Sequence, residues 1–109
     1  MKKEEKITCP IEFTVHLMGG KWKLPILHAL IKASPKRFKE LEREIEGITP
    51  TMLTTQLRAL EADGLVSRKI FATVPPTVEY RLTPHGKTMR KMIAEIEKWG
   101  LQHMQKRRN

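Results

Sequence analysis

The segment 38–82 constrains the fold most, because its structural signals follow one another in a fixed order. Apolar residues at helical spacing predict a helix over about 37–46, and Gly47 ends it. A second helix begins at Pro50, where proline is favoured, after Thr49 as the N-cap residue. Two helices joined by so short a turn are typical of a helix-turn-helix motif.

A basic β-hairpin is predicted directly after the second helix of this motif, which ends near Asp63. Residues 65–73 are rich in β-branched and basic side chains, and residues 78–82 alternate apolar and polar positions, as a half-buried strand does. The Val-Pro-Pro-Thr sequence at 74–77 forms the turn between the two strands. The expected fold class is therefore α+β, mostly α: a winged helix-turn-helix with a two-stranded wing.

A chain of 109 residues buries enough surface for one hydrophobic core, so we expect a single domain over 1–109. Proline and glycine mark the ends of its outer helices: Pro10 starts the first, Gly19-Gly20 ends it, and Thr83-Pro84 starts the last. The segments outside the motif and its wing are a flexible N-terminal tail at 1–8, helices at about 10–18, 21–33 and 84–104, and a basic C-terminal tail at 105–109.

The charge balance favours a polyanionic partner. The sequence has 21 Lys and Arg residues against 12 Asp and Glu, a net charge of +9 with neutral histidines. Double-stranded DNA fits both this charge and the helix-turn-helix pattern. A membrane surface is disfavoured, because the basic residues are spread over several elements. No apolar run is long enough to span a bilayer, no signal-peptide pattern follows Met1, and Cys9 is the single cysteine, so we expect a cytoplasmic protein.

The helix that begins at Pro50 has the pattern of a recognition helix. At about 100° per residue, Leu53, Leu57 and Leu60 share the face that docks the helix on the core. The opposite face carries short hydroxyl side chains and one arginine, which can hydrogen-bond base edges in the major groove. A solvated helix face often has similar residues, but the neighbouring turn and wing favour DNA. The predicted base-reading residues are Thr49, Thr51, Thr54, Thr55 and Arg58.

Cations on the hairpin and before the turn are predicted to contact the DNA backbone. Such side chains lie beside phosphates or in the minor groove when a wing flanks the duplex. The alternative for the hairpin is a set of edge-strand charges that prevent aggregation. The predicted backbone and wing contacts are Arg37, Lys39, Arg68, Lys69 and Arg81.

The last helix carries a longer apolar stripe than a small three-helix core needs. We interpret the stripe as a homodimer interface shared with the first helix; the alternative is packing within one subunit. A twofold dimer places its recognition helices about 34 Å apart, one turn of B-DNA, and therefore predicts a palindromic site. The predicted interface residues are Ile11, Val15, Met89, Met92, Ile93, Ile96, Trp99 and Met104.

Several short motifs follow one another along the chain. They are Cys9-Pro10, Gly19-Gly20-Lys21-Trp22, Phe38-Lys39-Glu40-Leu41, Ile48-Thr49-Pro50, Leu53-Thr54-Thr55-Gln56-Leu57-Arg58-Ala59-Leu60-Glu61, Asp63-Gly64-Leu65-Val66, Val78-Glu79-Tyr80 and Leu82-Thr83-Pro84-His85-Gly86. Each fragment is weak by itself, but the ordered set is specific and covers nearly the whole chain. It resembles the HxlR family of bacterial transcription regulators, a branch of the winged-helix regulators related to MarR.

The resemblance implies a dimeric DNA-binding regulator, a repressor or an activator, whose first and last helices build the dimer. Some members of the family sense electrophiles or oxidants through a cysteine just before the first helix, and Cys9 stands in that position. Thiols at helix N-termini tend to be reactive. Because the chain has a single cysteine, a disulfide formed on oxidation would join two subunits, or join the protein to a small thiol. The alternatives are a small-molecule effector, or a structural cysteine in a protein without an effector.

Other function classes fit the sequence less well. Its four histidines are scattered outside any metal or catalytic motif, and no glycine-rich phosphate loop occurs, so we expect no enzyme, no metal and no cofactor. A winged-helix protein–protein interaction module without specific DNA binding is the second hypothesis, although such modules usually lose the basic outer face. RNA binding favours stacking aromatics, and only Phe71 and Tyr80 lie near the wing.

Overall fold

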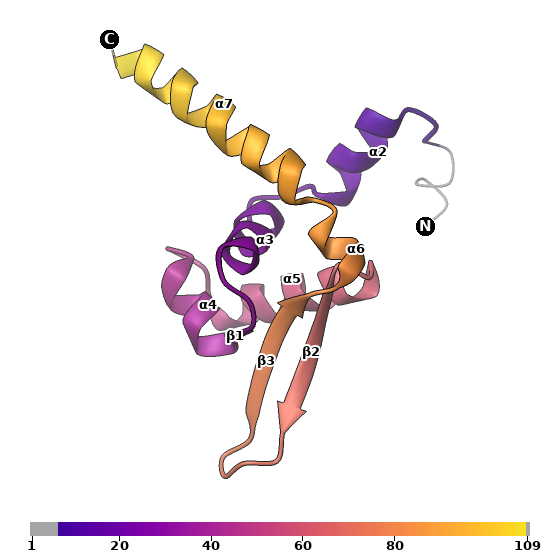
Figure 1. Cartoon of the computed structure of the whole chain (residues 1–109), viewed down its shortest axis with the longest axis vertical. Coiled ribbons are helices and arrows are strands. Elements are labelled where there is room, and N and C mark those ends of the chain that lie inside the picture. Colours follow the sequence, from indigo (N-terminus) through magenta and orange to yellow (C-terminus); the bar gives the residue numbers. More distant parts are fainter. Residues whose placement is uncertain (1–6, 109) are drawn as a thin grey trace.

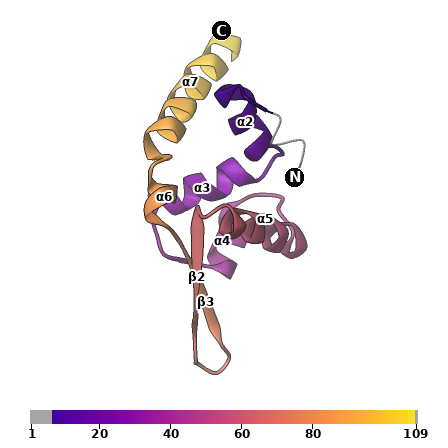
Figure 2. The ribbon, with the colours of Figure 1, turned by 90° about the vertical axis from the view of Figure 1, so that its right-hand side faces the viewer.

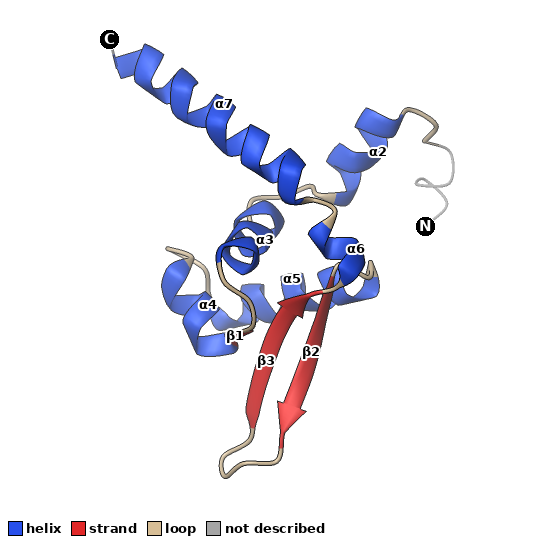
Figure 3. Cartoon of the chain, in the orientation of Figure 1, coloured by secondary structure: helices blue, strands red, loops and turns tan. Residues whose placement is uncertain are grey.

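The computed structural model describes residues 7–108, whose elements are mostly helical with one small sheet (Figures 1 and 3). In chain order they are α2 (Pro10–Leu17), α3 (Lys23–Lys32), β1 (Lys36–Arg37), α4 (Phe38–Glu44), α5 (Pro50–Ala62), β2 (Val66–Phe71), β3 (Thr77–Leu82), α6 (Pro84–Lys87) and α7 (Arg90–Arg108). Helices α4 and α5 form the helix-turn-helix, and β2 and β3 form the wing, so the predicted fold class is confirmed. Of the flexible tail predicted at 1–8, only residues 7 and 8 are described, and neither belongs to a helix or strand.

The sheet has three antiparallel strands in the order β1-β3-β2. The wing strands pair in register from Val66 opposite Leu82 to Phe71 opposite Thr77. The third strand, β1, was not predicted, and Arg37 belongs to it instead of opening the following helix. Arg37 is extended, with φ −81° and ψ 158°, because its backbone is the cap of α4 and pairs with β3.

The turn between the two motif helices spans residues 45–49. Gly47 adopts a positive φ of 89°, a conformation that glycine takes without steric cost, and thereby redirects the chain. Ile48 then enters the core, and Thr49 caps α5 by accepting a hydrogen bond from the Met52 N–H at 3.1 Å. The sequence signals for this turn and cap are confirmed.

The core lies around α3, which contacts α4, α5, α7 and β3. Its innermost side chains come from three helices, each of which presents one apolar face inward. The largest fully buried side chains are Ile26, Leu27, Leu30, Leu41, Leu53, Leu57 and Leu60. A core of this composition fixes the orientation of α5 and leaves its opposite face outside.

The last predicted helix is in fact two helices, α6 and α7, which are separated at residues 88 and 89. Thr83 caps α6, accepting from the Gly86 N–H at 2.9 Å and donating to the Gly64 carbonyl at 2.6 Å. Gly86 approaches the chain so closely that a Cβ there would lie 2.1 Å from the Leu65 carbonyl oxygen. This docking ties α6 to the start of the wing, and α7 leaves in a new direction. Helix α7 continues to Arg108, so residues 105–108 are helical and do not form the predicted tail.

Helices α2 and α7 project from one end of the molecule, and the wing projects from the other (Figures 1 and 2). Helix α2 has no buried residue, and Ile93 is the buried residue of α7. These two helices are therefore arms that the core of one chain does not cover.

Candidate nucleic-acid interface

The exposed face of α5 carries the residues that the sequence predicts to read bases. Thr51, Thr55 and Arg58 are exposed, and Thr54 is half-buried at the edge of the face. The Thr55 hydroxyl donates to the Thr51 carbonyl at 3.0 Å, which orients its oxygen along the helix. Thr49 lies one position before the helix, where its hydroxyl oxygen already caps the Met52 N–H. The orientation predicted for α5 is thus confirmed, with Thr49 acting as the cap.

A cleft of about 220 Å³ lies between α5 and the wing. Thr54, Arg58 and Glu61 line its helix side, and Arg68 and Tyr80 line its strand side. The cleft brings two predicted DNA contacts, Arg58 and Arg68, to the same place although they belong to different elements.

Glu61 and Arg68 form an ion pair across this cleft, with 3.3 Å between Glu61 Oε2 and Arg68 Nε. Among the described residues no group donates a hydrogen bond to Glu61 Oε2, so the contact is electrostatic. The Arg68 side chain is half exposed and the Glu61 side chain is mostly buried. Arg68 was predicted as a phosphate contact, but in this structure it also joins the wing to the recognition helix.

Tyr80, on β3, lines the same cleft as Glu61 and Arg68. Burial raises the pKa of Tyr80 above its ordinary value of 10.0, and the Glu61 carboxylate raises it further, while the charges of Arg68 and Arg58 oppose the shift. The balance of these effects favours the neutral phenol. Sequence reasoning missed the roles of Glu61 and Tyr80, although Glu61 follows Arg58 by three residues and so shares its face, and Tyr80 pairs in register with Arg68.

The other two wing cations lie on the opposite face of the hairpin from Arg68. Side chains alternate along a strand, and Lys69 and Arg81 both have the opposite parity to the Arg68–Tyr80 pair. The Arg81 guanidinium lies 3.8 Å from the Glu79 carboxylate, and Lys69 Nζ lies 5.1 Å from the centre of the Phe71 ring. The predicted set Arg68, Lys69 and Arg81 is thus divided between the two faces of the wing.

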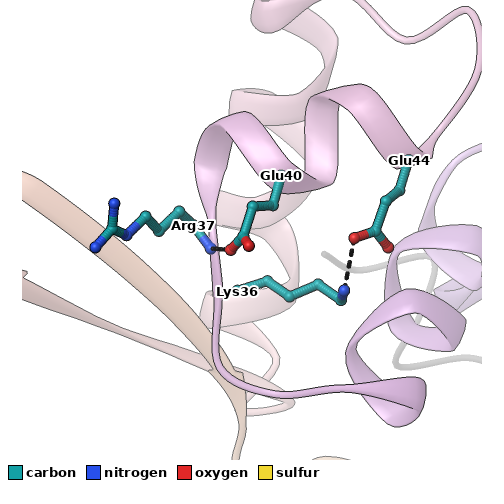
Figure 4. Close-up of polar contacts among 4 residues, drawn as sticks. All are labelled: Lys36, Arg37, Glu40 and Glu44. Atoms are coloured by element: carbon teal, nitrogen blue, oxygen red, sulfur yellow. Dashed lines mark hydrogen bonds and ion pairs between the residues drawn. The ribbon is translucent and has the colours of Figure 1, made fainter.

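Two predicted phosphate contacts, Arg37 and Lys39, lie at the start of α4, and Figure 4 shows the first of them. The Arg37 backbone N–H donates to Glu40 at 2.7 Å, which caps α4, and Lys36 Nζ lies 2.6 Å from Glu44. These contacts leave the Arg37 guanidinium extending away from both carboxylates, as Figure 4 shows. Lys39 is exposed on the first turn of α4. Arg37 and Lys39 therefore remain available to phosphates.

The arms carry most of the predicted dimer interface. Ile11 and Val15 of α2 are 75% and 66% exposed, and α7 exposes Met92, Ile96, Trp99 and Met104. A groove of about 610 Å³ lies between the arms, lined by Ile11, Val15, Met18, Leu24, Met92 and Ile96. Ile93 is wrong for this role because it is only 4% exposed, whereas Met89 is partly buried against the core between α6 and α7. Both complete the core of their own chain.

Cys9 is an exposed free thiol at the N-cap of α2. Within residues 7–108, no three or more His, Cys, Asp or Glu side chains are grouped so that they could hold a metal ion. Over the same residues, no helix combines the length and apolar character needed to cross a membrane.

The chain is similar to transcriptional regulators in sequence and in structure. The model of the HxlR-like helix-turn-helix family matches residues 17–108. The HTH-type transcriptional regulator YybR of Bacillus subtilis (strain 168) is 47% identical over 92 residues, which cover 84% of this chain and 73% of YybR. The regulator BH0655 of Halalkalibacterium halodurans is also 47% identical, over 86% of this chain and 83% of that protein.

Solved structures of two regulators, one of them a redox regulator, share the fold. HypR in its reduced form is 44% identical with a TM-score of 0.83, over 88% of this chain and 94% of that one. Reduced YodB from B. subtilis is 34% identical with a TM-score of 0.73, over 85% and 91% of the two chains. The protein therefore belongs to the HxlR-like helix-turn-helix family and is a transcriptional regulator of the helix-turn-helix type.

Proposed function

We propose that this regulator binds double-stranded DNA sequence-specifically, as a homodimer on a palindromic operator, to repress or activate transcription. The observation that carries the proposal is the exposed row of Thr51, Thr55 and Arg58 along the face of α5 opposite its buried leucines. An α-helix fits the major groove, where threonine hydroxyls bond base edges and an arginine binds guanine O6 and N7. The surface of α5 has the chemistry that base reading needs.

The surroundings of α5 support contact with the DNA backbone on both sides of the helix. Arg37 and Lys39 lie before the turn, and Lys69 and Arg81 lie on the wing. Cations that flank a recognition helix bind phosphates and fix its register on the duplex. Binding by these residues releases counterions, so the affinity is expected to fall steeply with salt.

The exposed arms support the homodimer. Ile11, Val15 and Ile96 line an apolar groove that one chain leaves open, and a second copy offers a matching surface under twofold symmetry. The arms lie at the opposite end from the wing, so a dimer joined through them leaves both copies of α5 outside the interface (Figure 2). Palindromic half-sites one helical turn apart suit this arrangement.

Cys9 supports a response to thiol oxidation, and a small-molecule effector is the second possibility. The thiol is exposed, and the similar proteins HypR and YodB include a redox regulator solved in two redox forms and a regulator solved after diamide treatment. Diamide is expected to change the DNA affinity of the wild type and to leave Cys9→Ser unaffected. Equal behaviour of the two proteins would assign Cys9 a structural role.

The function we propose is binding without catalysis, in the cytoplasm. No reaction is needed for the proposed activity, which depends on the affinity of the folded dimer for its operator. The competing function is an interaction module that contacts proteins through the same fold without specific DNA binding.

Selection of DNA from a randomised duplex pool tests the proposal. We expect the wild type to enrich a palindromic sequence and to bind it far more tightly than a scrambled duplex, with a loss of affinity as salt rises. Affinity that is equal for all duplexes would support the interaction module instead. The Thr55→Ala variant should reduce the preference for the enriched sequence, whereas Thr88→Ala, which also removes an exposed hydroxyl that donates to a nearby backbone carbonyl, should not.

A further inference from the structure

A hollow of about 420 Å³ lies between α3 and the end of α4. Its lining comes from residues 21–32 on one side and residues 44–46 on the other, so this α3–α4 hollow is separate from the recognition helix, the wing and the groove between the arms. Trp22, Pro25 and Ala29 follow one another at spacings of three and four residues, and one face of α3 thus forms the floor. Pockets of about 300–1,000 Å³ hold small ligands, and the hollow falls within this range.

The walls of the α3–α4 hollow suit a flat apolar group. Trp22 is the N-cap residue of α3 and is half-buried, and its ring forms part of the lining. Pro25 and the buried Ile45 add apolar surface to the same lining. An aromatic ring stacks on tryptophan, or packs edge-on against it, at about 4.5–7 Å between ring centres. This lining therefore favours a planar aromatic ligand over a flexible polar one.

The lysines of the hollow favour an anion. Lys21 Nζ lies 4.8 Å from the centre of the Trp22 ring, so a cation stands directly beside the aromatic wall. Lys32 lines the hollow nearer the C-terminal end of α3. Within residues 7–108, neither lysine forms an ion pair with a carboxylate. A carboxylate on the ligand would supply that counter-charge.

The other ionisable groups of the hollow are mostly engaged elsewhere. Glu44 is paired with Lys36, whose Nζ lies 2.6 Å from the Glu44 carboxylate (Figure 4). His28 Nε2 lies 3.4 Å from the carboxylate of Glu97 on α7. Glu46 is exposed and is the remaining carboxylate of the lining, against two lysines. The charge balance of the hollow is therefore positive, which disfavours a cationic ligand.

The hollow adjoins the turn of the helix-turn-helix. Ile45 and Glu46 line the hollow and also begin the turn that leads to α5. A Cβ on Gly47 would lie 3.7 Å from Trp22 Cη2, so the edge of the tryptophan ring packs against the backbone of this turn. The turn ends at Thr49, the cap of α5. A ligand that displaces Trp22 or Ile45 therefore also displaces the start of the recognition helix.

We propose that the α3–α4 hollow binds a planar aromatic carboxylate as an effector, with the ring against Trp22 and the carboxylate beside Lys21. The regulatory part of this inference rests on the proposed function and names the chemical class of its small-molecule effector. The ligand and DNA are coupled when each favours a different position of the turn. A bound anion also offsets one positive charge of the protein, so the expected effect is weaker DNA binding.

Two-dimensional proton–nitrogen NMR spectra of the full chain without DNA test the binding step, with 2-naphthoate as the probe. The chain has two tryptophans, Trp22 and Trp99, and therefore two indole N–H signals, which Trp22→Phe assigns. We expect 2-naphthoate to shift the signals of the Trp22 indole and the Gly47 amide. A shift at Trp99 alone would place the probe on the arms, and an unchanged spectrum would mean that the hollow takes no such ligand; either result would overturn the inference.

A matched pair of variants tests the role of the lysine. Lys21→Gln removes the proposed counter-charge from an exposed position, and Lys91→Gln makes the same change at an exposed position of α7. We expect Lys21→Gln to weaken 2-naphthoate binding roughly fivefold, because a charge-assisted contact is lost, and Lys91→Gln to bind like the wild type. The uncharged 2-naphthamide should bind Lys21→Gln and the wild type equally. Equal affinity of these two proteins for 2-naphthoate would contradict the site.

The effector role is measured on the duplex that the wild type enriches from a randomised pool. Saturating 2-naphthoate is expected to weaken wild-type binding to this duplex roughly fivefold. At the same probe concentration, Lys21→Gln should lose less affinity. An operator affinity that is unchanged at saturation would overturn the effector role. If the wild type enriches no sequence, the proposed function fails, whereas the NMR titration still decides whether the hollow binds the aromatic anion.

Discussion

Arg68 of the wing lies 3.3 Å from Glu61 of the recognition helix, measured from Nε to Oε2. This ion pair joins the recognition helix to the wing, the two elements that contact DNA in the proposed complex. It also engages the Arg68 guanidinium, which could otherwise bind a phosphate. Its contribution to stability is small, about 0–1 kcal/mol, because the arginine side chain is 46% exposed. Its larger effect concerns which charges are available to DNA.

Glu61→Gln is expected to strengthen DNA binding. The change removes a negative charge from the proposed interface and frees Arg68 for a phosphate. The slope of log affinity against log salt concentration should therefore steepen by the amount expected for about one additional phosphate contact. Binding titrations at several salt concentrations measure this slope, and Glu95→Gln on α7 is the matched control. An unchanged slope would mean that Arg68 stays away from the DNA.

Arg58→Ala is expected to reduce discrimination between the enriched operator and a scrambled duplex by roughly 1–3 kcal/mol, because a bidentate contact to guanine is lost. Arg58→Lys keeps the charge but not the planar guanidinium. Compared with Arg58→Ala, it should therefore recover affinity for any duplex but not the preference for the enriched operator. Competition titrations with both duplexes separate the two effects. If Arg58→Ala kept the preference of the wild type, Arg58 would not be a base-reading residue.

Tyr80→Phe is expected to change the alkaline limb of the stability curve. The pKa of Tyr80 is raised in the folded state, chiefly by burial, so above pH 10.0 the unfolded chain loses the phenol proton first. The wild type therefore becomes easier to unfold as the pH rises. The stabilisation that the neutral phenol provides is lost as the pH passes through the pKa of the folded state. Denaturant unfolding between pH 8 and about 11 should show a steeper decline for the wild type than for Tyr80→Phe. Parallel curves would contradict the shift.

Ile96→Glu is expected to dissociate the proposed dimer. Ile96 lines the groove between the arms and is about half exposed, so a carboxylate there would be buried without a partner in the dimer. The dissociation constant should rise by at least about tenfold. Ala94→Glu is the control, because Ala94 lies about 200° from Ile96 on the same helix. Sedimentation velocity distinguishes the forms, and a wild type that sediments as a monomer would contradict the dimer.

Local signals made much of the fold predictable. The periodic leucines of α5, its Thr49 cap and the turn glycine Gly47 all act within a few residues, so the sequence alone locates the helix and its outward face. For the same reason Thr51, Thr55 and Arg58 could be assigned to one exposed face before the structure was known.

The features that were missed depend on contacts between distant segments. The strand β1 has only two residues and exists because it pairs with Tyr80 and Glu79, more than 40 residues along the chain. The break before α7 depends on the close approach of Gly86 to Leu65. Ile93 falls on the same apolar stripe of the last helix as the predicted interface residues, and only the three-dimensional packing shows that it belongs to the core.

Methylation protection of guanine N7 on the enriched operator measures most directly whether α5 reads DNA. We expect the wild type to protect guanines in two half-sites whose centres are about 10 base pairs apart, and Arg58→Ala to lose that protection. Guanines that stay equally reactive with and without the protein, on a duplex that it binds, would contradict base reading by α5.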